Sequence, residues 1–194
     1  MTEKADLVEK ILDRELKMFL TVPTQQKASC QEHPDSFRDM RRAQFLAWSE
    51  ETLESYLKDL QKAERDGVNL MTQKYARMDN LIPTLNNSPL IEKIIEIQYG
   101  WQKEMFERYP NLMGRGRALS SAEDTAFQTS FETYLSGELE TYSDETLASL
   151  YRDVSERLEK GDNMTEELYS HMVKGLGYRS LEEAETNAGK AGKQ

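Results

Sequence analysis

The stretch Trp-Ser-Glu-Glu-Thr-Leu-Glu-Ser-Tyr-Leu-Lys-Asp-Leu at residues 48–60 returns as Tyr-Ser-Asp-Glu-Thr-Leu-Ala-Ser-Leu-Tyr-Arg-Asp-Val at residues 142–154. In both copies a serine stands where an N-cap is expected, and the acidic residues after it favour the positive end of a helix dipole. The apolar residues that follow recur at three- and four-residue spacing, which is typical of one buried helix face. The stretch therefore predicts the same capped, amphipathic helix at two places in the chain.

The similarity extends beyond this helix. A shift of 94 residues aligns positions 28–78 with 122–172 without a gap, and 13 of the 51 pairs are identical. Chance similarity between two amphipathic helices would match only apolar positions. Here the residues that set helix ends also coincide: Gly67 matches Gly161, and Asn69 matches Asn163. We therefore expect an internal duplication.

The expected fold is all-α, with about eight helices in two pseudo-symmetric four-helix repeats. Helix-favouring residues are abundant and no apolar alternation of period two is present, so no strand is predicted. The first repeat covers residues 1–78, residues 79–89 form a linker, and the second repeat covers 90–178. Residues 179–194 have little to bury and predict a flexible tail. The two repeats are expected to pack as one domain.

Composition narrows the functional classes. The chain of 194 residues has a formal net charge of −10 and one cysteine, Cys30. The acidity argues against nucleic-acid binding, which needs a basic face. The charged N-terminus lacks the apolar block of a signal peptide, and no apolar run is long enough to cross a membrane. A cytoplasmic protein with no membrane or nucleic-acid partner is the expectation.

The two copies differ in charge at equivalent positions. Arg38 corresponds to Glu132, Arg42 to Ser136 and Gln44 to Glu138. Arg41 corresponds to a leucine, and the segment from residue 118 to 151 contains no lysine or arginine. We therefore predict that the two helices face each other, so that the three arginines meet Glu132 and Glu138.

The loop Gly114-Arg115-Gly116-Arg117 is a candidate anion site. Its glycines would let backbone amides approach a ligand, and two guanidinium groups can fork onto phosphate or carboxylate. The alternative is that these arginines pair with the acidic second half, and the same alternative holds for Arg41, Arg42 and Arg77. The sequence favours ion pairs over a ligand clamp at all of these positions.

Other chemistry receives weaker support. Cys30 with His33 nearby could form a nucleophile and base, but a free, partly buried cysteine at a helix entry is the favoured interpretation. An all-carboxylate magnesium site through Glu123, Asp124, Glu132 and Glu138 competes with a solvated acidic face, which is favoured. No metal and no cofactor are predicted. Whether the chain is an enzyme, and its oligomeric state, stay undecided.

Two functions remain open. The first is binding, and turnover if the protein is an enzyme, of a small anionic or zwitterionic ligand in a polar cleft between the repeats. The second is an acidic helical module that docks a basic protein without catalysis. For the first function the candidate ligand-binding residues are Arg41, Arg42, Arg77, Arg115, Arg117, Glu132 and Glu138.

Several stretches resemble a family of uncharacterised bacterial proteins, domain-of-unknown-function family 4125. They are Ala-Ser-Cys-Gln at 28–31, Met-Arg-Arg-Ala-Gln-Phe-Leu-Ala-Trp-Ser-Glu-Glu at 40–51, Lys-Tyr-Ala-Arg-Met at 74–78, Gly-Arg-Gly-Arg at 114–117 and Thr-Ser-Phe-Glu-Thr-Tyr-Leu at 129–135. The resemblance implies a bacterial source and a shared site among these polar residues. It implies no activity.

Overall fold

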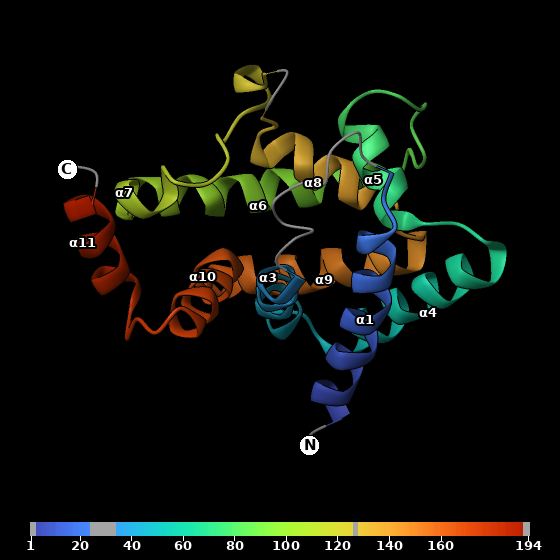
Figure 1. Ribbon diagram of the computed structural model, residues 1–194, viewed down its shortest axis with the longest axis horizontal. Coiled ribbons are helices and arrows are strands. Elements are labelled where there is room, and N and C mark those ends of the chain that lie inside the picture. The colour runs from blue at the N-terminus through green and yellow to red at the C-terminus, as the bar shows by residue number, and fades with distance from the viewer. Residues whose placement is uncertain (1–2, 24–33, 126–127, 192–194) are drawn as a thin grey trace.

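The computed structural model describes residues 3–23, 34–125 and 128–191, and this part of the chain is helical without a strand. It contains ten α-helices rather than the eight or so that were expected. Figure 1 shows them as a helical assembly in which α6 and α9 run side by side and α11 lies at one end. The prediction of an all-α fold is confirmed.

The first 78 residues form four described helices. Their bounds are α1 Glu3–Leu20, α3 Pro34–Leu46, α4 Glu50–Asp66 and α5 Leu70–Met78. Residues 79–88 form no helix and lead to the second set. Its members are α6 Pro89–Arg108, α7 Pro110–Met113, the short 3₁₀ helix η1 Ser121–Glu123, α8 Phe131–Leu139, α9 Asp144–Lys160, α10 Met164–Gly175 and α11 Leu181–Ala191.

The predicted helix ends are confirmed at the level of individual hydrogen bonds. The Ser49 side chain accepts from the Thr52 amide, and the Ser143 side chain accepts from the Thr146 amide. Both helices then end at a glycine in the left-handed region, with φ of 68° at Gly67 and 72° at Gly161. Only glycine enters this region at no steric cost, so both glycines are genuine helix stops.

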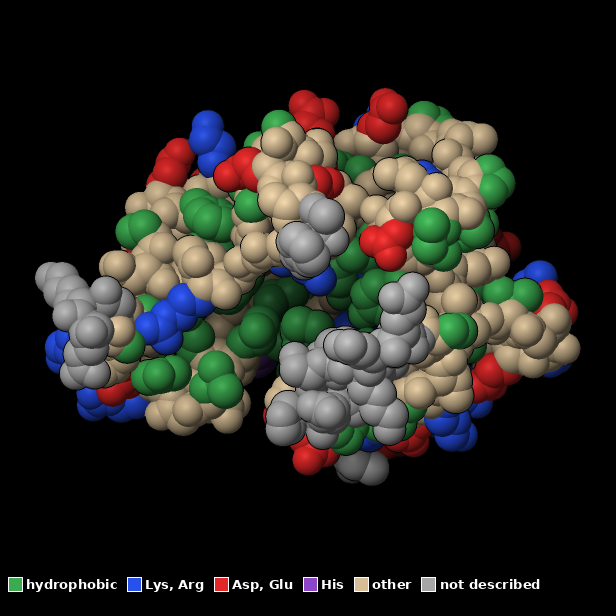
Figure 2. Space-filling view, turned by 45° about the horizontal axis from the view of Figure 1, so that its top comes forward, with side chains coloured by type: hydrophobic (Ala, Val, Ile, Leu, Met, Phe, Trp, Pro, Cys, Tyr) green, Lys and Arg blue, Asp and Glu red, His purple; other side chains and the backbone are tan. Residues whose placement is uncertain are grey.

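One large apolar core unites the helices of both halves, from α1 to α10. Aromatic rings pack at its centre, with Trp48 against Tyr142 at 6.0 Å and Tyr56 against Tyr142 at 4.8 Å between centroids. A second, smaller cluster lies where α6, α7, α10 and α11 meet. Figure 2 shows a hollow on one face with an apolar floor, and charged side chains of both signs spread around it.

The C-terminal region differs from the expected flexible tail. Residues 181–191 form α11, which packs on α7 and α10. Leu181, Ala184 and Ala188 are buried at a spacing of three and four residues, so the helix does have an apolar stripe. The stripe was missed because two of its three members are alanines, which add little to the hydrophobic pattern.

Candidate functional site

Four charged side chains lie almost completely buried at the centre of the molecule. Arg41 and Lys74 are each 1% exposed, Glu15 is 0% exposed and Glu138 is 2% exposed. They come from α1, α3, α5 and α8, so both halves of the chain contribute. Buried charges are tolerated only when they are paired and hydrogen-bonded, and these four satisfy one another. We call this set the buried charge cluster.

Arg41 is the bridge of the cluster. Its Nη2 and Nε donate to the two carboxylate oxygens of Glu15 at 2.6 and 2.7 Å, which is the bidentate fork that arginine favours. Its Nη1 donates to Glu138 Oε1 at 2.9 Å. Lys74 Nζ reaches the other oxygen of Glu138 at 2.5 Å. Two cations and two carboxylates thus alternate in a neutral chain.

Tyrosines complete the hydrogen bonding. The Tyr56 hydroxyl donates to Glu15 at 2.6 Å, and the Tyr142 hydroxyl donates to Glu138 at 2.6 Å. The Tyr134 ring lies under Lys74, with Nζ 3.6 Å from the ring centroid. Both carboxylates therefore lie among aromatic rings and away from solvent. The low local dielectric strengthens their hydrogen bonds and ion pairs.

Opposing effects set the ionisation of these groups. Burial disfavours the charged form of Glu138, but Arg41 and Lys74 outweigh it and hold the pKa of the carboxyl below its usual range. Burial is also the main influence on Lys74, and it lowers the pKa of the amine although Glu138 acts in the opposite direction. Burial likewise raises the pKa of Tyr56 and Tyr142.

The predicted meeting of basic and acidic helices holds for one arginine. Arg41 reaches Glu138, whereas Arg38 and Arg42 both bind Glu9 on α1, and Arg38 also donates to Asp13 at 2.8 Å. The prediction that they meet Glu132 and Glu138 is wrong for these two. All three arginines meet carboxylates of α1, but only Arg41 is buried deeply enough to reach α8 as well, whereas Arg38 and Arg42 lie at the partly exposed edge of the α1–α3 contact.

A pocket of about 330 Å³ opens on the other side of the contact between α5 and α8. Ion pairs and polar groups dominate its wall, with a small apolar part from Ile95 and Met78. Its lining is Arg77, Met78, Asn80, Ile95, Ser121, Asp124, Glu132, Thr133, Ser136, Gly137 and Glu140. Two of the predicted ligand-binding residues, Arg77 and Glu132, therefore share one cavity. We call it the α5/α8 pocket.

The cation of the α5/α8 pocket is already neutralised. Arg77 donates to both oxygens of Glu140, at 2.6 and 3.1 Å, and to the carbonyl of Ile82 at 2.9 Å. Glu140 also accepts from the Leu85 amide at 3.1 Å. This pair raises the pKa of Arg77 and ties the segment after α5 to α8.

Two further carboxylates of the pocket bind neutral donors. Glu132 accepts from the Ser121 amide at 2.7 Å, and Asp124 accepts from the Ser130 amide and the Thr133 hydroxyl. The Thr133 hydroxyl is the main reason that the pKa of Asp124 lies below its usual range. Neither carboxylate forms an ion pair within the described residues. Arg117 lies outside the wall but also lowers the pKa of Asp124, so the charge of this carboxylate is partly compensated, whereas Glu132 accepts only from a neutral amide in the described part of the chain.

Close helix approach shapes the floor of this pocket. Gly137 faces α5, and a Cβ at this position would lie 2.9 Å from Met78 Cγ and 3.2 Å from the Lys74 carbonyl oxygen. Glycine is therefore required for α5 and α8 to touch here. The same contact carries Lys74–Glu138 on its inner side and Arg77–Glu140 on its outer side.

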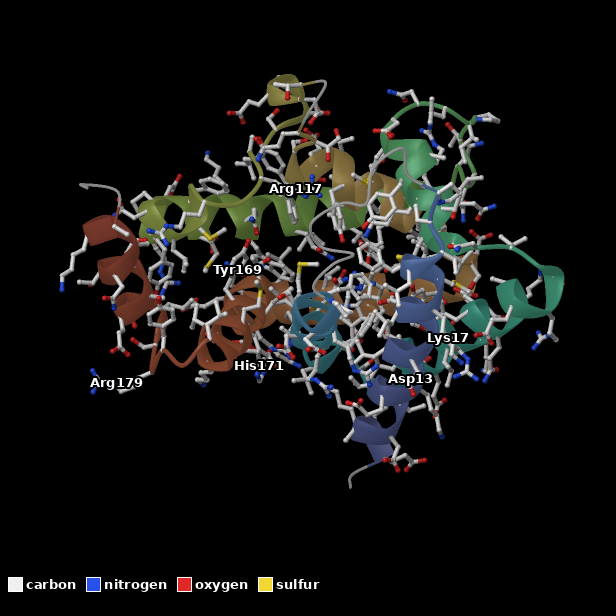
Figure 3. All side chains as sticks on the ribbon, in the orientation of Figure 1. Asp13, Lys17, Arg117, Tyr169, His171 and Arg179 are labelled. Carbon is white, nitrogen blue, oxygen red and sulfur yellow. The ribbon has the colours of Figure 1, made fainter. Side chains whose placement is uncertain are left out.

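The arginines of the Gly114–Arg117 loop bind the protein itself. Arg115 donates to the Ala188 carbonyl at 2.9 Å. Arg117, labelled in Figure 3, donates to the Thr129 carbonyl at 2.8 Å, and its guanidinium carbon lies 4.6 Å from the centroid of the Tyr134 ring. Their guanidinium groups meet carbonyl oxygens and a ring rather than acidic side chains. These contacts favour a structural role over a phosphate clamp.

Several residues of the two sites were not singled out from the sequence. Glu15 and Lys74 complete the buried charge cluster, and Glu140 pairs with Arg77. Glu15 did carry a signal, because it lies three residues after Leu12 and four before Phe19 on the buried face of α1. A charged residue on an apolar helix face predicts a buried partner of opposite charge.

The metal and nucleophile candidates of the sequence fall partly outside the described residues. Among residues 3–23, 34–125 and 128–191, no group of three or more His, Cys, Asp or Glu side chains is placed to hold a metal ion. Cys30 and His33 lie outside the described residues. His171 lies on α10, with its Nε2 3.9 Å from a Glu167 carboxylate oxygen (Figure 3).

Fold and sites together define an all-helical protein with a neutral charge cluster in its core and an acidic pocket beside it. No helix in the described ranges combines the length and apolarity needed to span a membrane. The chain belongs to the family described as protein of unknown function DUF4125, whose family model matches residues 5–186. Neither a curated protein nor a solved structure matches the chain.

Proposed function

We propose that this protein binds a small zwitterionic ligand in the α5/α8 pocket, at the junction of two pseudo-symmetric repeats. The observation that carries the proposal is the charge imbalance of the wall. Asp124 and Glu132 have no cationic partner there, whereas Arg77 is bound by Glu140. A protonated amine would supply the missing positive charge, in a cavity at the small end of the range for ligand sites.

The same wall disfavours the anionic class. A phosphate or dicarboxylate needs free donors, and the guanidinium of Arg77 is already occupied by Glu140 and the Ile82 carbonyl. Arg41 is buried, and Arg115 and Arg117 bind carbonyl oxygens elsewhere. An anion would also meet Glu132 and Asp124, and like charges at short range are repulsive. Of the two predicted ligand classes, the zwitterion fits better.

Contacts between equivalent residues support the two-repeat part of the proposal. In a two-fold arrangement, residues on the axis touch their own counterparts. Gln44 Nε2 donates to Glu138 at 3.1 Å, and these residues are 94 positions apart. The Trp48 ring contacts the ring of Tyr142, again 94 positions along. Both pairs lie at the centre of the molecule, as an axis between repeats 1–78 and 90–178 requires.

Reciprocal bonds away from the axis agree with it. Asp153 accepts from the Ser49 amide at 2.9 Å and the Thr52 hydroxyl at 2.7 Å. Asp59 accepts from the Ser143 amide at 3.1 Å and from the hydroxyl of the threonine three residues later at 2.7 Å. Each repeat thus supports the start of the long helix in the other, as in an isologous interface.

Thermal-shift screening tests the ligand proposal. Amino acids, dicarboxylates, sugar phosphates and diamines would be compared, and a ligand at 100 times its dissociation constant adds about 2.7 kcal/mol to stability. We expect compounds that carry a protonated amine, zwitterions among them, to raise the melting temperature more than the dicarboxylates and sugar phosphates. Glu132→Gln should abolish that rise, and the matched control Glu145→Gln, exposed in the first turn of α9, should keep it. Equal stabilisation of both variants would refute the site.

The alternative function, an acidic module that docks a basic protein, makes a different prediction for the same screen. No small compound would stabilise the chain, while a lysine- and arginine-rich peptide would bind in a strongly salt-dependent manner. The stretch from 118 to 151 without a lysine or arginine is the feature that such a peptide would contact.

A further inference from the structure

Two side chains of α8 bring unused polar groups to the α5/α8 pocket, where α5 and α8 lie side by side (Figure 1). Glu132 and Ser136 are four residues apart, so they are neighbours on one face of the helix. Glu132 Oε2 accepts from the Ser121 amide at 2.7 Å, whereas its Oε1 has no donor in the described part of the chain. The Ser136 hydroxyl has no hydrogen-bond partner there either. Both groups are therefore available to a ligand.

A third unused side chain reaches the pocket from the turn after α5. The Leu81 amide donates to the Ala76 carbonyl at 2.8 Å, and α4, α9 and α10 end with the same kind of bond. The residue before that amide has a positive φ in all four turns: it is Gly67, Gly161 or Gly177 in three of them and Asn80, with φ of 53°, in the fourth. Glycine adopts this conformation at no steric cost, so the turn alone does not need the Asn80 side chain. That side chain lines the pocket and has no hydrogen-bond partner among the described residues.

The three unused groups match the donors of a primary ammonium group. A primary ammonium has three N–H donors and no acceptor. Glu132 supplies a carboxylate oxygen with the opposite charge, Ser136 a hydroxyl oxygen and Asn80 a side-chain carbonyl oxygen. Hydrogen bonds from a charged donor are about twice as strong as those between neutral groups. Ile95 and Met78 leave an apolar part of the wall for the carbon chain of the ligand.

The same wall offers little to a fully methylated amine. A quaternary ammonium has no N–H donor, and proteins recognise it with the faces of aromatic rings. None of the described residues that line the α5/α8 pocket is aromatic. A trimethylated amine would therefore keep only its charge attraction to Glu132 and would leave the Ser136 and Asn80 oxygens unpaired.

We propose that the α5/α8 pocket selects a primary ammonium group, which donates to Glu132, Ser136 and Asn80, over the trimethylated form of the same amine. This inference rests on the proposed function of the pocket and narrows its ligand to one class of head group. Ser136 and Asn80 are then the residues that determine specificity, because they distinguish amines of equal charge by the number of N–H donors.

Two pairs of probes test the head group. γ-Aminobutyrate is compared with its N-trimethyl analogue, and butylamine with butyltrimethylammonium, so the charge and the carbon chain stay the same within a pair. Concentration-dependent thermal shifts give the dissociation constants. We expect the primary amine of at least one pair to bind about tenfold more tightly than its trimethylated partner. Equally tight binding of both partners would overturn this inference and leave the pocket as an amine site, whereas no binding by any of the probes would refute the proposed function and this inference together.

Asn80→Gly separates recognition of the ligand from formation of the turn. The other three turns use glycine, so the variant without ligand should be at least as stable as the wild type, while the primary amine should bind about tenfold more weakly. Asn80→Asp keeps an acceptor oxygen and should retain the binding. Ser136→Ala should weaken binding to a similar degree, and the matched control Ser36→Ala, at an exposed position in the first turn of α3, should not. Unchanged affinity in Asn80→Gly or in Ser136→Ala would overturn the site of three acceptors.

Discussion

Glu138 is the residue on which the core charges converge. Arg41, Lys74, Gln44 and the Tyr142 hydroxyl all donate to its two oxygens. With four donors and no access to water, this carboxylate has no alternative partner if one donor is lost. Removing one partner of a buried pair is therefore far more costly than replacing the whole pair by apolar groups.

Glu138→Gln is the direct test at this residue. The amide keeps the shape but leaves Lys74 without a carboxylate and Glu15 as the one counter-charge for two buried cations, which should cost about 3–5 kcal/mol of unfolding free energy. Urea denaturation measures this loss. The matched control Glu159→Gln changes an exposed residue near the end of α9 and should stay within about 0.5 kcal/mol. A loss no larger than the control's would mean that the cluster contributes nothing.

The ionisation of Glu138 also determines how the stability of the protein responds to acid. The folded pKa of Glu138 lies below the 4.5 of an unperturbed glutamate, so the unfolded state binds more protons between the two values. The contribution of Glu138 to the free energy of unfolding is therefore fully present above pH 4.5 and is lost as the pH falls below it. Denaturation midpoints measured across this window should decline more steeply for the wild type than for Glu138→Gln, which has no proton to gain there. Parallel slopes would contradict the assignment.

At the scale of the helix, contact between α5 and α8 depends on one missing side chain. Gly137→Ala would place a methyl group against Met78 and the α5 backbone, and overpacking of this kind costs about 1–3 kcal/mol. Gly100→Ala is the matched control, because it lies in α6 with nothing within 4 Å of the added Cβ. There helix propensity should raise stability by up to about 1 kcal/mol. Melting temperatures that move in the same direction would refute this reading of the contact.

Helix positions could be predicted from the sequence where a cap and a stop occur together. Ser49 with Gly67 and Ser143 with Gly161 mark the two long helices correctly. α7 was missed because its four residues begin at Pro110, which reads as a stop, and its cap comes from Glu185 far along the chain. The expected linker lacks a helix as far as residue 88, and α6 begins at its last residue, Pro89. The ion pair Arg77–Glu140 that holds it could not be predicted from the local pattern.

Site residues were predictable only where the two copies differ in charge. Arg41 and Glu138 stood out by comparison with their counterparts, and they do meet. Arg42 looked the same by that criterion yet lies at the partly exposed edge of the contact between α3 and α1 and binds Glu9. Which face of a helix meets which neighbour is a tertiary fact, and it decides whether an arginine is a core bridge or a surface pair.

On the scale of the whole molecule, the core and the charge cluster join both halves. We therefore expect a single cooperative unfolding transition. Trp48 reports from the first half and Trp101 from the second, and both are buried in the same core. In single-tryptophan variants, Trp48→Phe and Trp101→Phe, fluorescence and far-ultraviolet circular dichroism should give coincident midpoints. Separate midpoints for the two reporters would show that the halves unfold independently.

The buried cluster also has a consequence for synthesis on the ribosome. Arg41 and Lys74 emerge early, and the first half then holds only Glu15 to balance two cations destined for the interior. Glu138 is made 97 residues after Arg41. Closing the first half before that moment would bury an unmatched charge, so the nascent chain should stay open until the second half has left the exit tunnel.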